Sequence, residues 1–483
     1  MPMIEAPVTI EHPVGSRVPQ FLPDQEPLAR QPVLALFEGT EVQAPAKATV
    51  VHAVVAGDYR EVVELAIQFI VDGKVVGHRR LDLGKAMHGL HVRIALPSPG
   101  ASMRVVQVEG SQAVWVLAPH SSFPRSGLLA CSGTCGQDRL EMFTENLRLG
   151  AITQFGWNLG CVTEACSDMA ALKHAGEWDD ALLNYLSPFL VEGNHLRYQN
   201  SRGAVETDTL SVEAGLPCAG LARHPLLAAN YRELGRRLAE HWLDHVAGHR
   251  EHLTAEGTYC TAYPMLQTAR WIEEDAPDIG RRLQEAARQA LTWRREALSL
   301  PNGIALRNHR GKLSFVNWAR AWAWYLLGEV RSARLDRGHC HEAKLKEQLR
   351  QALGFQREDG LWGGFVDDSG SAPDTSGSAG IAAAMLWAAK LDLLPVETAR
   401  RSALTCWHGL SPWIDEAGWV HGNCPGNRRG EGFQRGPTRD ANAFAVGLVG
   451  QLHAGLLGAG ITKSELAAAW SREPKVRSQP LGE

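Results

Sequence analysis

The chain has 483 residues, and two folded units are expected because a single hydrophobic core rarely grows beyond about 250–300 residues. Its 49 basic and 53 acidic residues give a formal net charge of -4 and form no sustained basic block, so nucleic acid is not an expected partner. No segment reaches the roughly 18 apolar residues of a membrane span, and the first residues lack the pattern of an export signal, so no membrane partner is expected.

The first part of the chain has the texture of a β protein. Residues 1–30 are rich in proline and are expected to form an extended arm. Residues 31–120 contain short, alternating, β-branched segments separated by turn residues, which predicts an antiparallel β-sandwich. Asp72-Gly73 between IQFIV and KVVGH predicts a hairpin, because both residues tolerate the left-handed backbone of a tight turn. Residues 121–137 are expected to be a linker.

The rest of the chain, residues 138–475, consists of amphipathic helices with Ala, Leu and Trp on one face, and strands are expected to all but vanish. About six pairs at a spacing of roughly 50 residues, without a strict short repeat, favour a closed (α/α)6 toroid as the catalytic domain over an open solenoid. The pairs are expected at residues 140–190, 208–247, 258–298, 317–356, 374–410 and 438–471.

The cysteines indicate a cytoplasmic protein. There are nine of them, an odd number without the paired spacing of a Cys or His metal site, and we expect mostly reduced, buried thiols. Cys131 and Cys135 in CSGTC could be redox-active or bind a metal, but a small loop between the domains is the preferred interpretation. Neither a metal nor an organic cofactor is expected.

In a closed ring of helix pairs, the loops before the inner helices meet at one end of a central funnel. The string NWARAWAW lies there, and its Arg320 and Trp324 are four residues apart on one helix face. An indole offers a flat surface for a sugar ring, and a guanidinium can grip a carboxylate with two hydrogen bonds. Trp318 precedes them. Spacing alone slightly favours the plainer alternative, in which the tryptophans are core and Arg320 pairs with a structural partner.

Other polar residues fall in the same set of loops. Asp374 and Ser376 in PDTSGSA open a helix and are strong capping residues, although a run of small hydroxyl residues also lets a ligand approach. Asp208 in ETDTLS is equally suited to cap a helix or to act as an acid with a pKa raised by burial. His309 in RNHRG could contact a substrate or donate a proton. The remaining substrate-binding candidates are Trp157, Tyr263, Arg435 and Asp440, and Tyr259 is a third catalytic candidate.

At these residues the chain resembles the unsaturated glucuronyl and rhamnogalacturonyl hydrolases of glycoside hydrolase families 88 and 105. The family string WARGQAW or WGRGNGW is similar to WARAWAW, and DSSAAAIAA or ETSASAMFA is similar to DTSGSAGIAAAM. The resemblance covers roughly residues 140 to 460. It implies that Arg320 and Trp324 line a uronate subsite, that His309 contacts the sugar, and that Asp208 corresponds to the first of two active-site aspartates.

The resemblance also implies a reaction. In that family a carboxylic acid starts hydration of the C4–C5 double bond of a terminal unsaturated uronic acid, and the glycosidic bond then collapses. The second aspartate of the family, usually the proton donor, has no counterpart in Gly257-Thr258-Tyr259-Cys260-Thr261. Either Asp208 transfers the proton, or Glu256 replaces the missing acid, or the chemistry differs.

The leading hypothesis is therefore a glycan-degrading enzyme that releases a terminal uronic acid, most simply a 4,5-unsaturated one, from an acidic oligosaccharide. One alternative is a toroid lyase in which Tyr259 and His309 remove a proton and protonate the leaving oxygen while Arg320 neutralises the carboxylate. Another is a saturated-uronate glycosidase that pairs Asp208 with Asp374 or Asp440. A carbohydrate-binding protein with a decayed site is the alternative outside enzymes. Three roles stay open for the β-rich part: it binds sugar, it packs on the rim of the funnel, or it forms a homodimer.

Overall fold

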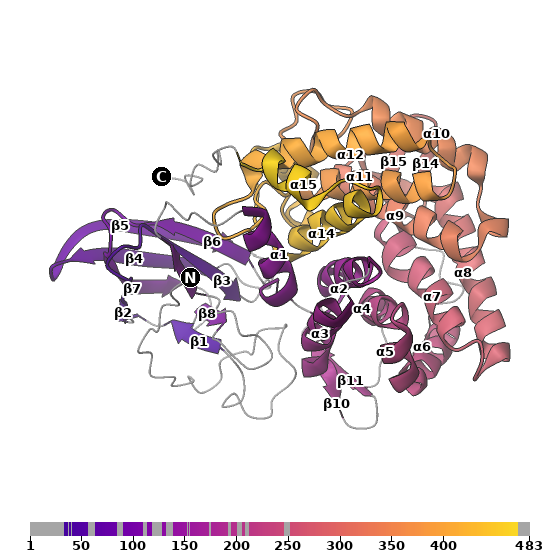
Figure 1. Ribbon diagram of the computed structural model, residues 1–483, viewed down its shortest axis with the longest axis horizontal. Coiled ribbons are helices and arrows are strands. Elements are labelled where there is room, and N and C mark those ends of the chain that lie inside the picture. Colours follow the sequence, from indigo (N-terminus) through magenta and orange to yellow (C-terminus); the bar gives the residue numbers. More distant parts are fainter. Residues whose placement is uncertain are drawn as a thin grey trace.

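The computed structural model describes residues 33–36, 38–39, 41–56, 63–84, 90–109, 114–117, 128–131, 139–151, 153, 155–172, 175–191, 195–199, 205–207, 212–245 and 252–471. Figure 1 shows the strands of the N-terminal part on one side and a larger body of helices on the other. The expected order, sheets first and helices afterwards, is confirmed. Among the described residues, no helix combines the length and the apolar character needed to cross a bilayer.

The N-terminal strands form two antiparallel sheets. One has the order β2-β7-β4-β5, and the other has the order β1-β8-β3-β6, with β9 also paired to β3. The hairpin predicted at Asp72-Gly73 is confirmed, because both residues have positive φ and Val71 pairs with Lys74 across the turn. The strands are β1 (Val33–Leu36), β2 (Glu41–Val42), β3 (Val50–Ala56), β4 (Val63–Val71), β5 (Lys74–Gly84), β6 (Leu90–Ala95), β7 (Ser102–Glu109), β8 (Val114–Leu117) and β9 (Leu128–Cys131).

Strand β9 lies in the stretch that the sequence assigned to a linker. Its residues pair with β3 from Val50↔Cys131 to Ala53↔Leu128, so the sheet continues beyond residue 120. The run LLAC is short and apolar, and it gave no alternating pattern by which it could be recognised as a strand. Cys135 lies outside the described residues. Free thiols are found at Cys161, Cys166, Cys218, Cys260, Cys340, Cys406 and Cys424.

The helical part is built around an inner set of helices that contact one another in a closed order. Helix α2 packs on α4, α4 on α7, α7 on α9, α9 on α11, α11 on α14, and α14 on α2 again, and Figure 1 shows these helices arranged around a common centre. Their first residues all face one end of the ring. The inner helices are α2 (Trp157–Ala170), α4 (Val212–Ala222), α7 (Tyr263–Trp271, preceded by the π-helical turn Thr258–Ala262), α9 (Ala319–Leu335), α11 (Thr375–Lys390) and α14 (Ala443–Gly458).

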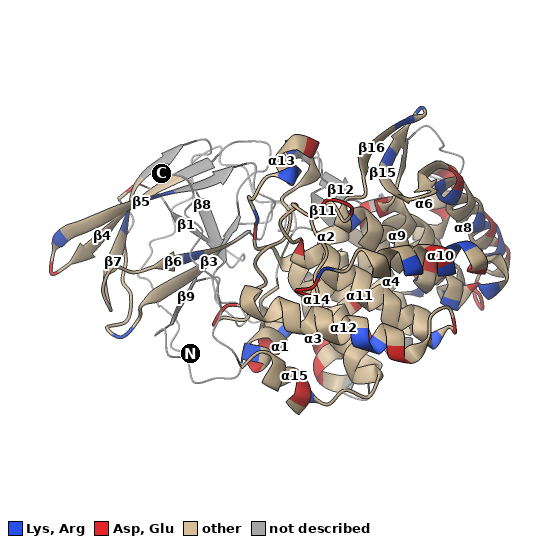
Figure 2. Ribbon diagram, turned by 90° about the horizontal axis from the view of Figure 1, so that it is seen from above, with Lys and Arg blue, Asp and Glu red and all other residues tan. Residues whose placement is uncertain are grey.

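Further helices cover the inner set on the outside, and the colouring of the ribbon in Figure 2 marks charged residues along the outer helices α8, α10 and α12. Helix α8 has an apolar face with Leu283, Ala287 and Leu291 and a charged opposite face, as expected for a helix between core and solvent. The remaining helices are α1 (Arg139–Leu149), α3 (Ala175–Leu186), α5 (Pro225–Asn230), α6 (Arg232–His245), α8 (Pro277–Leu298), α10 (Glu342–Gly354), α12 (Val396–Leu410), α13 (Glu431–Arg435) and α15 (Lys463–Ala469), with short 3-10 turns at Ser187–Phe189, Arg337–His339, Ser411–Trp413 and Asn427–Arg429.

The expectation that strands all but vanish after residue 138 is wrong. Two small sheets accompany the helices, and the larger one contains a hairpin whose turn is Arg310-Gly311, both with positive φ. The run GIALRNH–RG–KLSFV carries the alternation and turn chemistry of a hairpin, which the sequence analysis interpreted as a loop. The strands are β10 (Leu190–Val191), β11 (His195–Gln199), β12 (Val205–Thr207), β13 (His252–Thr254), β14 (Ser299–Leu300), β15 (Gly303–His309) and β16 (Lys312–Val316).

Small residues bring the inner helices close together. A Cβ atom on Gly377 would lie 2.7 Å from Cβ of Ala319, and a Cβ on Gly380 would lie 2.7 Å from Cβ of Ala323. Gly447 would similarly meet the backbone of Cys161 at 2.5 Å. The small residues of DTSGSAGIAAAM therefore serve the packing of α11 on α9, in addition to any role beside a ligand.

Candidate functional site

An aromatic cluster stands at the end of the ring where the inner helices begin. The indole of Trp157, at the start of α2, meets Trp324 of α9 edge-on with ring centres 5.5 Å apart, and Phe444 of α14 at 5.1 Å. Tyr259, just before α7, stacks on the other side of Trp324 at 5.8 Å and 14°. Trp157 is partly exposed, whereas the other three are buried. Residues far apart in sequence thus meet at one end of the ring.

Arg320 lies at the same end, on the first turn of α9. Its guanidinium carbon is 4.3 Å from the ring centre of Trp318 and 5.1 Å from that of Phe444. Its Nη1 and Nη2 donate to the backbone oxygens of Cys424 and Pro425, at 2.8 and 2.5 Å. The side chain is only 2% exposed. The positive charge of Arg320 is therefore stabilised by two carbonyl dipoles and two aromatic faces. These groups are structural partners of the kind that the plainer alternative for Arg320 expected.

Asp374 caps helix α11, Ser376 is the second residue of that helix, and both are fully buried. Oδ1 of Asp374 accepts from the backbone N–H of Ser376 at 3.1 Å, from its hydroxyl at 2.6 Å, and from the N–H of Cys424 at 3.2 Å. The capping function is thus established. Oδ2 has no partner within the described part of the chain, which is unusual for a buried carboxyl oxygen.

The two tyrosines point from the cluster into the ring. Their rings stack at 5.9 Å, and each hydroxyl donates to a different side chain: Tyr259 to Oε1 of Gln451 at 3.0 Å, and Tyr263 to the carboxyl of Glu164 at 3.1 Å. Burial raises the pKa of both hydroxyls. Tyr259 therefore keeps its proton at neutral pH, which disfavours it as a base.

A buried polar network fills the centre of the ring, and the sequence analysis missed it. Arg331 of α9 holds Glu164 at 2.8 Å and Asp168 at 2.6 Å, and Arg223 holds the same two carboxyls at 2.9 and 2.5 Å. Gln451 accepts from Arg331 at 2.9 Å and links the network to Tyr259. One signal was available in the sequence. Glu164 and Asp168 stand four residues apart in WNLGCVTEACSDMA, a helical run with no other charged residue.

Electrostatics favour the ionised form of Asp168 in this network. Burial opposes ionisation of Asp168, but the guanidinium groups of Arg223 and Arg331 outweigh it and hold the pKa of Asp168 below its usual range. Two arginines and two carboxyls balance one another, so the charges can be buried together. The network is therefore a structural set of ion pairs that fills the interior between the two ends of the ring.

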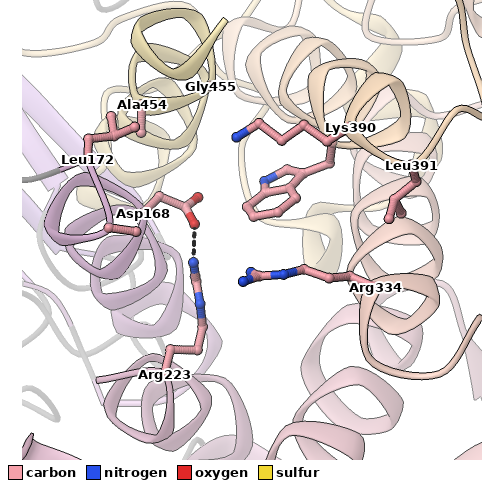
Figure 3. Close-up of a pocket in the computed structure, with 10 residues that line it drawn as sticks. Asp168, Leu172, Arg223, Arg334, Lys390, Leu391, Ala454 and Gly455 are labelled. Carbon is pink, nitrogen blue, oxygen red and sulfur yellow. Dashed lines mark hydrogen bonds and ion pairs between the residues drawn. The ribbon is translucent and has the colours of Figure 1, made fainter. Parts of the chain in front are cut away.

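A pocket of about 340 Å³ opens at the other end of the ring, where the inner helices finish. Figure 3 shows Asp168 paired with Arg223 on one side and Arg334 and Lys390 on the other. Trp387 lies among these cations, with Arg334 and Lys390 at 5.0 and 4.7 Å from its ring centre. Burial, assisted by neighbouring cations, lowers the pKa of Arg334 and of Lys390. The pocket lining carries more positive than negative charge.

The remaining sequence candidates fall in three places. His309 ends β15 and is exposed beside the hairpin turn, opposite Lys312. Arg435 is exposed on α13, where it pairs with Glu431 at 3.0 Å and stacks on Phe365, while Asp440 pairs through its backbone with Asn423. Asp208 lies outside the described residues. The structure thus brings together Trp157, Tyr259, Trp318, Arg320, Trp324, Asp374 and Ser376 around the start of the inner helices, with Tyr263 one turn deeper.

Part of the chain is similar to a known family of enzymes. The model of Glycosyl Hydrolase Family 88 matches residues 264–454, which contain both WARAWAW and DTSGSAGIAAAM. The resemblance that these motifs suggested is confirmed, and this part of the chain is similar to glycoside hydrolases. No curated protein matches the sequence.

Solved structures agree on the fold. A possible member of glycoside hydrolase family 105 from Klebsiella pneumoniae superposes with a TM-score of 0.56 at 14% identity, covering 67% of this chain and 93% of its own. A family 105 enzyme from C. acetobutylicum gives 0.54 at 13%, covering 67% and 100%. A family 88 glycosyl hydrolase from Bacteroides vulgatus gives 0.51 at 13%, covering 66% and 97%. At such low identity these likenesses establish the fold.

Proposed function

We propose that this chain is a glycan-degrading hydrolase that releases a terminal 4,5-unsaturated uronic acid from an acidic oligosaccharide. One observation carries the proposal: Arg320 and Trp324 of WARAWAW, both within the region that matches Glycosyl Hydrolase Family 88, lie in one cluster with Trp157 at the start of the inner helices. A cation beside flat aromatic surfaces is the combination that a uronate ring requires.

The reaction needs one acid and one water. A carboxylic acid delivers a proton to C4 of the unsaturated ring while water adds to C5, which gives a hemiketal. The hemiketal opens to a C5 ketone, and the hemiacetal thereby formed at C1 expels the aglycone as an alcohol. One water is consumed, and the proton returns to the acid. A pair of carboxylates on opposite faces of the sugar, as in ordinary glycosidases, is not required.

Asp208 is the proposed proton donor, because in the sequence it comes shortly before α4 (Val212–Ala222), and α4 begins at the same end of the ring as the aromatic cluster. Two other acids are near this end. Glu256 accepts from Nδ2 of Asn427 at 3.1 Å, and Oδ2 of Asp374 is buried beside the 424–425 segment. His309 is proposed as a sugar contact, and Arg435 and Asp440 as residues of the outer rim.

Substrate binding at Arg320 requires a rearrangement. The two nitrogens that would grip a carboxylate already donate to the oxygens of Cys424 and Pro425. A uronate therefore reaches Arg320 only if the 424–425 segment moves or if the uronate binds the remaining donors from the side of Trp157. Aromatic stacking does not depend on this step, because Trp157 is partly exposed already.

We further propose the finer architecture that the sequence suggested. The closed order of contacts among the inner helices supports an (α/α)6 toroid over residues 138–475. The two N-terminal sheets support a β-sandwich, which β9 extends to residue 131. Cytoplasmic localisation, supported by the free buried thiols, and a homodimer stay predictions.

The lyase alternative is weaker. It needs Tyr259 as a base, yet burial raises the pKa of its hydroxyl and the proton is donated to Gln451. A direct assay separates the two, because a hydrolase consumes the ultraviolet absorbance of the unsaturated uronate and a lyase creates it.

The test uses unsaturated uronyl disaccharides with the full chain. Wild type is expected to remove the absorbance, Asp208→Asn to abolish the removal, and Arg320→Met to raise KM for the acidic substrate. Arg139→Met is the matched control, since Arg139 also donates to backbone oxygens, of Ser411 and Ile414, but lies outside the aromatic cluster. The proposal fails if no absorbance is lost, or if Arg320→Met and Arg139→Met have the same KM.

A further inference from the structure

Three histidines and an aspartate meet where the N-terminal sheet contacts the helical part. His52 lies on β3 and His91 on the neighbouring strand β6, where Val54 pairs with His91. Residues 52 and 54 point to the same side of β3, so both imidazoles project from one face of the sheet. The His52 ring is 1% exposed and the His91 ring 4%.

The other two residues come from the segment that follows α12. Oδ1 of Asp415 accepts from the backbone N–H groups of Ala417 and Trp419, each at 2.9 Å, and this fixes the carboxyl orientation. Oδ2 is thereby left to face the histidines. The backbone N–H of His421 donates to the backbone oxygen of Trp413, which positions His421. The ring of Trp419 stacks on that of His91, with ring centres 4.5 Å apart and an angle of 7° between the ring planes.

Three of these side chains, those of His52, His91 and Asp415, direct one ligand atom each at a common point, with the three atoms within 4.8 Å of one another. Nδ1 of His52 is 3.0 Å from Nε2 of His91, and these atoms lie 3.5 and 3.8 Å from Oδ2 of Asp415. Nε2 of His421 is 2.7 Å from the same oxygen. In a tetrahedral zinc site with bonds of about 2.0–2.1 Å, ligand atoms lie about 3.3 Å apart. The observed separations lie on both sides of that value.

We propose that His52, His91 and Asp415 bind a zinc ion that fastens the N-terminal sheet to the helical part, and that His421 turns from its contact with Oδ2 of Asp415 to become the fourth ligand. Imidazole nitrogen and a single carboxylate oxygen are ligands that suit zinc, whereas calcium and magnesium prefer sites built from oxygen alone. With four protein ligands and almost no exposure, the site is structural. His421, whose side chain is 18% exposed, lies on the side from which the ion enters.

Surrounding contacts support metal ligation. Nε2 of His52 lies 3.3 Å from Oε1 of Glu416, and Glu416 is held in turn by Arg93 at 2.9 Å. A ligating histidine commonly directs its second nitrogen at a carboxylate, which fixes the ring and the tautomer. No metal was expected from the sequence, because ligands from three distant segments leave no compact ligand spacing.

The test measures zinc in the purified full chain and its effect on thermal unfolding. About one zinc per chain is expected, a chelator should lower the Tm, and added zinc should restore it. His91→Phe should lose the metal and the chelator response. His453→Phe is the matched control, because His453 is also buried and stacked on a tryptophan, Trp407 at 5.4 Å, but lies away from the cluster.

His421→Ala provides a second variant if His91→Phe does not fold, since His421 is the least buried ligand; it should bind zinc at least tenfold more weakly. Cobalt substitution should give wild type the absorption of a tetrahedral centre. The proposal is overturned if the wild-type chain carries less than one tenth of an equivalent after growth with zinc and its Tm ignores both chelator and zinc. In that case the histidines share a proton instead of a metal.

Discussion

The helical ring contains two buried arginines beside aromatic rings, one at the end where the inner helices begin and one deeper, in the centre of the ring, and the two have different partners. At the end where the inner helices begin, Arg320 donates to two backbone oxygens. Towards the other end, Arg331 is held by two carboxyls, which Arg223 also holds. Neutral carbonyls can release a guanidinium at modest cost, whereas ion pairs in a dry interior cannot. Arg320 can therefore exchange its partners for the carboxylate of the proposed substrate, whereas Arg331 is fixed.

The largest expected effect is at Arg331. Arg331→Met leaves two buried carboxyls with only Arg223, and should lower the free energy of unfolding by about 3–5 kcal/mol in urea titration. Arg435→Met, which removes an exposed ion-pairing arginine, should change it by about 1 kcal/mol or less. Equal effects of the two substitutions would show that charge does not hold the network.

Arg320 should matter less for stability and more for binding. Arg320→Met removes two charge-assisted hydrogen bonds and should lower the free energy of unfolding by about 2–3 kcal/mol. The same urea titration should rank it below Arg331→Met. If Arg320→Met is the more costly of the two, the contrast between the two ends is reversed, and Arg320 is a fixed structural residue.

The stacked tyrosines allow a finer comparison of charged and neutral hydrogen-bond partners, because substitution of either tyrosine by phenylalanine removes only a hydroxyl. Tyr263→Phe removes a donor to the carboxyl of Glu164, and Tyr259→Phe removes a donor to the neutral amide of Gln451. Loss of stability should be about 2 kcal/mol for the first and about 1 kcal/mol for the second. A larger loss for Tyr259→Phe would mean that the Gln451 link holds the ring together.

The smallest effect is a pH dependence. The folded pKa of Asp168 is held below its value in the unfolded chain, so its contribution to stability is complete above about pH 4. That contribution is lost as the pH falls through the folded pKa. Wild type should therefore lose stability in acid more steeply than Asp168→Asn in urea titrations between pH 5 and pH 3. Parallel curves would show that Asp168 is not a stabilising ion.

Much of the fold follows from local pattern. The Asp72-Gly73 turn, the order of sheets before helices and the positions of WARAWAW and DTSGSAGIAAAM were all predicted, because hydrophobic periodicity and turn chemistry act over a few residues. The hairpin around Arg310-Gly311 carried the same signals and was overlooked. Strand β9 was not predictable, since LLAC becomes a strand only by pairing with β3.

The candidate site divides in the same way. Sequence determined which residue types stand at the start of each inner helix, and hence that Trp157, Tyr259 and Arg320 could meet. Tertiary structure alone decided that the nitrogens of Arg320 are taken by Cys424 and Pro425, that Glu164 and Asp168 share two arginines, and that His52 and His91 face Asp415. These are contacts between segments tens to hundreds of residues apart. A chain specifies them through the packing of the whole ring, and no local pattern encodes which polar atom finds which partner.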